Sequence, residues 1–213
     1  MYNIIATGSK GNAAVIGGSI LVDCGVPYSK LAGVRQDLKL VLLTHQHGDH
    51  FKPRTIKALA SDRPTLRFVC CEWMAQLLDG LVERKNIDVL TPNYCYIYSG
   101  ICTVKPERLT HNVPNCGWHI WMKEKSIFYA TDTSTLKGVQ AENYDLYMIE
   151  ANHEKEELIE RARAKIERGE YAYEMDAAHN HLSRSDAEDW LYQNIGANGE
   201  YVFLHGHKEN ENA

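Results

Sequence analysis

Short apolar runs separated by turn residues dominate the first part of the chain. Residues 2–7 and 13–16 are two such runs, and the turn-forming sequence Gly8-Ser9-Lys10-Gly11-Asn12 lies between them. Residues 38–44 (LKLVLLT) form a continuous apolar run, which is typical of a strand buried on both faces. The pattern therefore predicts a β-rich first half. The strands expected there cover residues 2–7, 13–16, 19–23, 38–44 and 66–71.

Helix signals alternate with these strands. Pro53 in a first turn, with Ile56 and Leu59 on one face, predicts a helix over residues 53–62. Further helices are expected over residues 72–81, over 155–168 with Gly169 closing it, and from the Ser183 cap to residue 194. Strand-like patterns fill residues 87–131, 146–150 and 201–204.

Two successive groups of strands and helices predict an α+β fold in which two sheets pack together under outer helices. A length of 213 residues fits either one large domain or two small ones, but no low-complexity linker or internal repeat divides the chain. We therefore expect residues 1–213 to form a single domain.

Composition narrows the class of protein. Hydrophobic residues make up 44% and charged residues 24% of the chain, which is typical of a soluble globular protein. The formal net charge of -5 argues against a generic polyanion-binding surface. We find no leader-like segment and no apolar run of the ~20 residues that a membrane span needs, so we expect a cytoplasmic protein without membrane contact. The six cysteines include no CxxC pair, which predicts reduced thiols rather than a zinc finger.

Four metal-ligand side chains lie within six residues directly after the strand expected at 38–44. They are His45, His47, Asp49 and His50, and Gly48 lets the backbone turn tightly between them. Imidazole and carboxylate groups without cysteine suit a catalytic zinc or manganese site. Scattered HxH pairs often lie on surfaces by chance, but this density at the end of a strand predicts a metal site.

One short loop cannot complete the coordination of two ions, so other ligands are needed. His111, Asp132 and His205 each follow an apolar, strand-like run. This shared position at the end of a strand predicts that they join the loop in one site. A carboxylate such as Asp132 can bridge two ions, because each oxygen can bind one.

The sequence THQHGDH at residues 44–50 resembles the HxHxDH signature of the metallo-β-lactamase superfamily. Residues 21–25 (LVDCG) resemble the D-x-G element of that family, which implies that Asp23 supports the metal loop from behind the ligands. His111, Asp132 and His205 fall in the order and approximate spacing of the later ligands of the family. The resemblance covers nearly the whole chain and implies a four-layer αββα sandwich with the site at one edge.

Three further segments resemble the YycJ/WalJ-like subgroup. They are the GSxGN turn at residues 8–12, the E-x-N-H segment at 150–153 and the H-L-S segment at 181–183. Members of the subgroup are implicated in the hydrolysis of nucleic-acid phosphodiesters. A lactam substrate is disfavoured, because lactam-hydrolysing relatives usually hold the second ion partly through a cysteine, whereas here histidine and aspartate are expected.

The resulting hypothesis is a dinuclear phosphodiesterase that acts on nucleic acid or nucleotides with two divalent cations, Zn²⁺ or Mn²⁺. The first ion is assigned to His45, His47 and His111, the second to Asp49, His50 and His205, and Asp132 bridges them. Two such ions share a water, lower its pKa and supply a hydroxide that attacks phosphorus. Asp49 additionally orients that nucleophile.

Two histidines are candidates for the proton donor to the leaving group. His181 is the first choice and His153 the second, and for each the alternative is a purely supporting role. Backbone N–H groups of Ser9, Lys10, Gly11 and Asn12 are expected either to bind a phosphate or simply to form a hairpin turn.

Other functions stay open on the same site. One is hydrolysis of a small molecule, such as a cyclic nucleotide, a thioester or a lactone, and a pocket lined by Tyr94, Tyr96 and Tyr98 would favour a small ligand with a base. Packing of those tyrosines, including packing in a homodimer, explains them equally well. The minority alternative is a non-catalytic metal-binding interaction protein.

Overall fold

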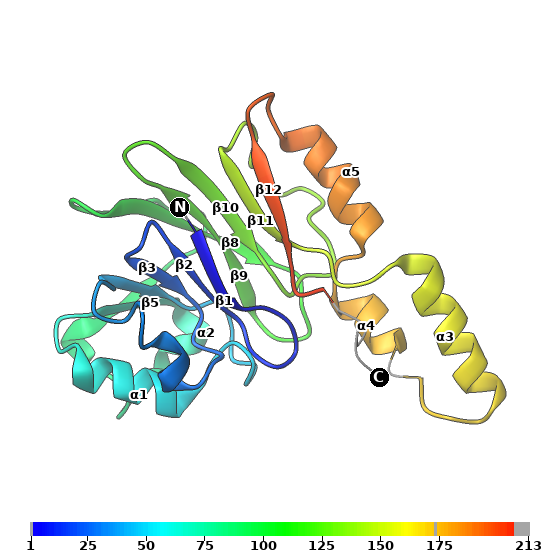
Figure 1. Ribbon diagram of the computed structural model, residues 1–213, viewed down its shortest axis with the longest axis horizontal. Coiled ribbons are helices and arrows are strands. Elements are labelled where there is room, and N and C mark those ends of the chain that lie inside the picture. The colour runs from blue at the N-terminus through cyan, green and yellow to red at the C-terminus, as the bar shows by residue number, and fades with distance from the viewer. Residues whose placement is uncertain (1, 173, 207–213) are drawn as a thin grey trace. The chain divides into compact units, whose positions relative to one another are not determined.

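The computed structural model describes residues 2–172 and 174–206 (Figure 1). The chain divides into two compact units, residues 1–106 and 107–213. The division falls within strand β8, Cys102–Leu109. Since a division of the fold into compact units is not a test of independent folding, a single domain over residues 1–213 stays a prediction.

Unit 1 contains a six-stranded sheet with the strand order β1-β2-β3-β4-β5-β6. Neighbouring strands are antiparallel from β1 to β3 and parallel from β3 to β6. The continuous apolar run becomes β4, whose three residues are all buried, as the pattern predicts. The strands are β1 (Tyr2–Ala6), β2 (Ala13–Ile16), β3 (Ile20–Val22), β4 (Leu40–Leu42), β5 (Arg67–Cys71) and β6 (Ile87–Leu90).

Helix α1 (Pro53–Asp62) covers part of this sheet and has the predicted bounds. Its buried face contains Ile56 and Leu59, which belong to the same core cluster as Leu21, Val41 and Phe68 from the sheet. Short 3₁₀ segments lie before α1 at Tyr28–Leu31 and after it at Gln76–Leu78 and Arg84–Asn86.

The second six-stranded sheet has the order β12-β11-β10-β9-β8-β7. Strands β9 and β10 are antiparallel, whereas β10, β11 and β12 are mutually parallel. In unit 2, helix α5 (Arg184–Asn194) lies along β11 (Figure 1). Its Trp190 packs with Phe128 and Tyr147 in the core of that unit. The strands are β7 (Tyr96–Tyr98), β8, β9 (Asn115–Trp121), β10 (Ser126–Ala130), β11 (Leu146–Glu150) and β12 (Glu200–Leu204).

Two features of the helices differ from the prediction. The helix expected over residues 72–81 is shorter, because only Glu72–Ala75 (α2) is α-helical before the 3₁₀ turn, and Gly80 then adopts a left-handed conformation. Helix α4 (Glu174–Asn180) was not predicted, since its sequence has no apolar periodicity. It contacts α3 (Lys155–Glu167), which ends as expected just before Gly169.

The three tyrosines near β7 do not share one role. The Tyr98 hydroxyl donates to Asp88 at 3.1 Å, the Tyr96 hydroxyl accepts from the Thr91 amide at 3.0 Å, and Tyr94 is 65% exposed. Two of them therefore bind the neighbouring β6 region through their hydroxyl groups, which favours the packing interpretation.

The six cysteines form no disulfide, and only Cys95 is exposed. Within the described ranges, none of the helices combines the length and apolar character that a membrane span requires.

Candidate metal centre

The carboxyl ends of parallel strands position the candidate ligands in both units. In unit 1, Asp23 follows β3 and His45 comes shortly after β4. In unit 2, His205 follows β12, and Asp132 comes two residues after β10. Because neighbouring parallel strands end at the same edge of a sheet, each unit gathers its polar side chains at one edge.

His45 and His47 converge within unit 1. The Nε2 atom of His45 lies 3.1 Å from Nδ1 of His47, and the Thr44 hydroxyl lies 2.9 Å from the other ring nitrogen of His45. His45 is completely buried. Two imidazole nitrogens that point at one another across this distance are arranged to bind one cation between them.

Asp23 supports the loop from behind, as the resemblance implies. Its fully buried carboxylate accepts hydrogen bonds from the Thr44 amide at 3.0 Å and from the Thr44 hydroxyl at 2.9 Å. The other carboxylate contact joins Oδ2 to Nδ1 of His50 at 2.7 Å. A carboxylate on Nδ1 fixes the tautomer and leaves Nε2 of His50 as the ligand atom.

Asp23→Asn is expected to weaken divalent-metal binding by about 10- to 100-fold, because the amide no longer orients His50 with a charged acceptor. Competition against a chromogenic chelator measures the affinity. The exposed Asp37→Asn is the matched control and should bind metal like the wild type. Equal affinity in both variants would show that Asp23 has no orienting role.

The Gly8–Asn12 turn contacts the metal loop through the backbone and the side chain of Asn12. The side-chain nitrogen Nδ2 of Asn12 lies 2.7 Å from Nε2 of His50. It also lies 3.3 Å from both the backbone carbonyl oxygen and Oδ2 of Asp49. Its carbonyl oxygen accepts from the Gly8 amide at 2.8 Å, which fixes the orientation of the group. Gly11 and Asn12 are buried, whereas Ser9 and Lys10 are exposed. Phosphate binding by residues 9–12 stays a prediction.

Gly25 permits the closest approach of the metal loop. A Cβ atom at this position would lie 1.6 Å from the backbone carbonyl oxygen of Asp49 and 2.7 Å from the backbone nitrogen of Asn12. Gly25→Ala should therefore lower the free energy of unfolding by about 3 kcal/mol, since backbone would have to move. Urea denaturation measures this loss. Gly33→Ala, which has open space around it, should change stability little, and equal effects of the two substitutions would refute the steric argument.

Unit 2 presents a carboxylate between two histidines. Oδ2 of Asp132 lies 3.8 Å from Nε2 of His111, and Oδ1 lies 3.5 Å from Nε2 of His205. Nδ1 of His111 lies 2.9 Å from the Asn180 carbonyl oxygen, so this nitrogen donates and Nε2 is the ring nitrogen with the lone pair. Asp132 thus directs one oxygen towards each imidazole, which is the arrangement that a bridging carboxylate requires.

Glu150 occupies a position to which the sequence patterns assigned no role. Its buried Oε1 lies 2.6 Å from Nδ1 of His181 and 3.2 Å from Nδ1 of His205. Burial raises the pKa of the carboxyl group, but the hydrogen bonds from His181 and His205 outweigh it and hold the pKa of Glu150 below its usual value. The position of Glu150 at the end of a buried strand was the available signal, the same one that identified Asp132.

His181 lies beside the two histidines of unit 2. Its ring centroid is 5.3 Å from that of His111 and 5.1 Å from that of His205, with which it stacks. Since Nδ1 contacts Glu150, Nε2 is the nitrogen left for a substrate. Together with Asp132, Glu150 and His205, His181 forms a group of side chains able to hold a metal ion.

His153 is the more enclosed of the two candidate donors. It is 8% exposed, and its Nδ1 has no hydrogen-bond partner within the described part of the chain. Burial lowers the pKa of His153, which favours the neutral ring. This geometry favours His181 over His153 as a proton donor.

Backbone strain concentrates at the candidate site. Among the described non-glycine residues, five have positive φ, and two of these are asparagines, which tolerate it well. The other three are Asp23, Asp132 and His205, with φ between 55° and 62°. Such conformations cost about 1–3 kcal/mol each and are concentrated at functional sites.

Comparisons with known proteins identify the family of this chain. The model of the Beta-lactamase superfamily domain matches residues 19–205. The exodeoxyribonuclease WalJ of Streptococcus pneumoniae is 26% identical over 238 positions, which cover 99% of this chain and 82% of the relative.

Solved structures show the same fold at lower identity. The metallo-β-lactamase fold protein YhfI from Bacillus subtilis has a TM-score of 0.69 at 18% identity, covering 98% of this chain and 87% of that one. The short form of human tRNase Z has a TM-score of 0.69 at 16% identity, covering 96% and 92%. The predicted metallo-β-lactamase-like α+β fold and the WalJ-like resemblance are confirmed, as is the predicted class of metal-dependent hydrolase. The chain belongs to the Beta-lactamase superfamily domain family, within the metallo-β-lactamase superfamily.

Proposed function

We propose that this protein is a dinuclear metal-dependent phosphodiesterase that hydrolyses nucleic acid. The observation that carries the proposal is the carboxylate of Asp132, which offers one oxygen towards His111 and the other towards His205. A carboxylate placed in this way is suited to two ions rather than one.

The donor set fits divalent cations such as Zn²⁺ or Mn²⁺, because it combines imidazole nitrogens with carboxylate oxygens. His45, His47 and His111 would hold one ion, and Asp49, His50 and His205 the other, with Asp132 shared. His50 would exchange its contact with the Asn12 amide for the ion. When bound, the two ions would supply a water activated at neutral pH and would neutralise charge on the phosphate oxygens.

The leaving oxygen needs a proton, and the pair of Glu150 and His181 is suited to deliver it. Glu150 accepts the Nδ1 proton of His181 and holds the ring in one orientation. The Nε2 atom of His181 then donates to the leaving oxygen, and the Glu150 carboxylate stabilises the imidazolium form before transfer. His153, whose ring is more deeply buried, serves as support in this assignment.

Nucleic acid is the proposed substrate because WalJ is named an exodeoxyribonuclease and the structural neighbour of human origin is a tRNase. The ligand set supports the same choice, since histidine and aspartate suit cations that bind phosphate oxygens. A small phosphodiester such as a cyclic nucleotide is the second candidate, and the exposed Ser9 and Lys10 are available to a phosphate in either case.

A substrate panel tests the proposal. The metal-stripped protein is reconstituted with Zn²⁺ or Mn²⁺ and assayed side by side on single-stranded DNA, double-stranded DNA, RNA and cyclic nucleotides. We expect hydrolysis of at least one polymer at a higher kcat/KM than any cyclic nucleotide. Turnover confined to cyclic nucleotides, or to a thioester or lactone included in the panel, would reject nucleic acid as the substrate.

A further inference from the structure

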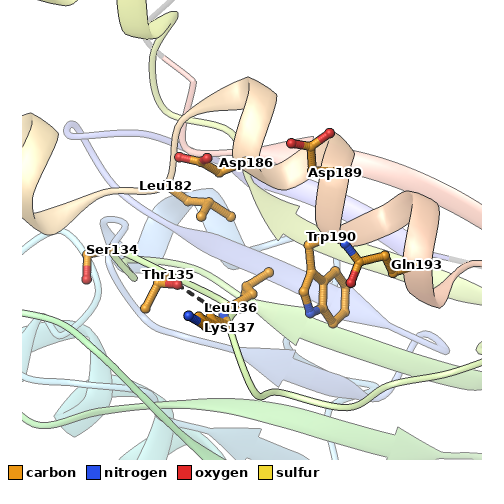
Figure 2. A pocket seen from close by; sticks show the side chains of 9 residues that line it. All are labelled: Ser134, Thr135, Leu136, Lys137, Leu182, Asp186, Asp189, Trp190 and Gln193. Atoms are coloured by element: carbon orange, nitrogen blue, oxygen red, sulfur yellow. Dashed lines mark hydrogen bonds between the residues drawn. The ribbon is translucent and has the colours of Figure 1, made fainter.

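A pocket of about 330 Å³ opens in unit 2 between helix α5 and the loop of residues 134–137 (Figure 2). This volume is at the lower end of the range of about 300–1,000 Å³ that is typical of small-molecule sites. The pocket therefore suits one small unit, such as a nucleoside, rather than a length of polymer.

Both walls of the pocket continue directly from the proposed catalytic residues. The loop wall begins at Ser134, two residues after Asp132, and the other wall includes Leu182, the neighbour of His181. A single carboxylate oxygen, Oε2 of Glu150, accepts from the Thr133 amide at 2.8 Å and from the Leu182 amide at 3.3 Å. The Glu150 carboxylate thus fixes the backbone where both pocket walls begin, next to the side chains proposed for catalysis.

Three largely buried apolar side chains lie at the base of the pocket. Leu136 and Leu182 are at most 2% exposed, and Trp190 is 8% exposed. The indole N–H of Trp190 donates to the Val139 carbonyl oxygen at 3.1 Å, so this side chain offers the pocket only carbon surface. Such a surface is suited to the face or edge of a planar ring.

Polar groups line the rim on two sides, as Figure 2 shows. Asp186, Asp189 and Gln193 are spaced i, i+3 and i+7, which places them on one face of α5. The Asp186 carboxylate already accepts from the Ser183 hydroxyl at 2.6 Å and from the Lys155 ammonium at 3.1 Å. Asp189 and Gln193 are exposed one and two turns further along α5, while Lys137 is exposed on the loop.

We infer that this pocket is a subsite for the nucleoside next to the scissile phosphate and that it selects a base carrying an amino group. The helix side presents carboxylate, which accepts hydrogen bonds and repels carbonyl oxygens. Guanine offers adjacent N–H donors to one carboxylate, and cytosine and adenine offer one amino group, whereas the N–H of uracil or thymine lies between two carbonyl groups. Lys137 on the opposite side suits a flanking phosphate.

This inference rests on the proposed function, and its test separates the two. The substrates are the p-nitrophenyl esters of the four nucleoside 5′-monophosphates, in which water replaces p-nitrophenol at phosphorus and the monophosphate is released. Each kcat/KM is divided by the value of the same variant on bis-p-nitrophenyl phosphate, which has no base. We expect the normalised kcat/KM of the guanosine ester to exceed that of the uridine ester by about tenfold, because one good hydrogen-bonding contact to a base edge discriminates between bases at about this level.

Asp189→Asn should reduce this preference to about twofold or less, since the amide presents both a donor and an acceptor. The control is Glu188→Gln, whose side chain lies outside the pocket lining and binds Arg184 at 2.9 Å; it should keep the wild-type preference. Equal normalised values for the four esters, or an unchanged preference in Asp189→Asn, would overturn the subsite.

Binding of GMP and UMP to the metal-free protein, measured by isothermal titration calorimetry, gives a readout that does not need turnover. Tighter binding of GMP that is lost in Asp189→Asn supports the subsite. If this is seen while no phosphodiester is hydrolysed, the proposed function fails and the subsite stands. Equal affinities for GMP and UMP would refute the subsite whatever the activity.

Discussion

Asp132→Ala should reduce the turnover of bis-p-nitrophenyl phosphate by about 10³-fold or more and should also lower the bound metal content. The reason is that Asp132 directs one carboxylate oxygen towards each of His111 and His205, the histidines assigned to the two different ions. Its loss removes a ligand from each ion together with a negative charge between them, and electrostatic contributions of this kind are worth several kcal/mol.

Asp132→Asn is the matched variant for this experiment. Asparagine tolerates the positive φ of 55° at this position and keeps the shape of the side chain, but it offers only one oxygen. We expect its activity to fall nearly as far as that of the alanine variant, while its free energy of unfolding stays close to that of the wild type. Steady-state kinetics and metal analysis check both variants. Turnover at the wild-type rate by either one would rule out Asp132 as the bridging ligand.

His181→Ala should slow the hydrolysis of DNA by about 10²- to 10⁴-fold while the metal content stays at the wild-type level. The expected loss depends on the leaving group. A nucleoside alkoxide leaves poorly without a proton, whereas p-nitrophenolate leaves without one. Turnover of bis-p-nitrophenyl phosphate should therefore fall by less than about tenfold, since proton donation contributes little to that reaction.

Three further variants distinguish proton donation by His181 from a structural role. Glu150→Gln should show the same dependence on the leaving group, because the amide no longer orients His181 with a charged acceptor. His153→Ala tests the runner-up donor and should have the smaller effect on DNA. The exposed His179→Ala, on the neighbouring helix α4, is the control and should behave like the wild type. Equal losses on both substrates in His181→Ala would indicate a structural role instead of proton donation.

The sequence was sufficient to predict the features that depend on local pattern. Buried strands are visible as apolar runs, and His45, Asp132 and His205 were identified because each comes shortly after such a run. The support of the loop by Asp23 was implied by the resemblance and has direct counterparts in its contacts with Thr44 and His50.

Features that depend on contacts between distant segments could not be predicted in the same way. Glu150 contacts His181 across 31 positions of sequence, and no local pattern identifies that pair. The Asn12 amide reaches His50 across 38 positions, so the turn around it looked like a phosphate loop or a hairpin. Helix α4 is short and held by its contact with α3, and tertiary contacts of this kind override weak local preference.

The central claim is that two divalent cations are needed for phosphodiester hydrolysis by this chain. A titration of the metal-free protein with Zn²⁺ or Mn²⁺, followed by turnover of bis-p-nitrophenyl phosphate and by metal analysis of the same samples, tests it most directly. We predict no turnover without metal and a rise that reaches its plateau at two ions per chain. Full turnover in the metal-free protein, or a plateau at a single ion, would contradict the claim.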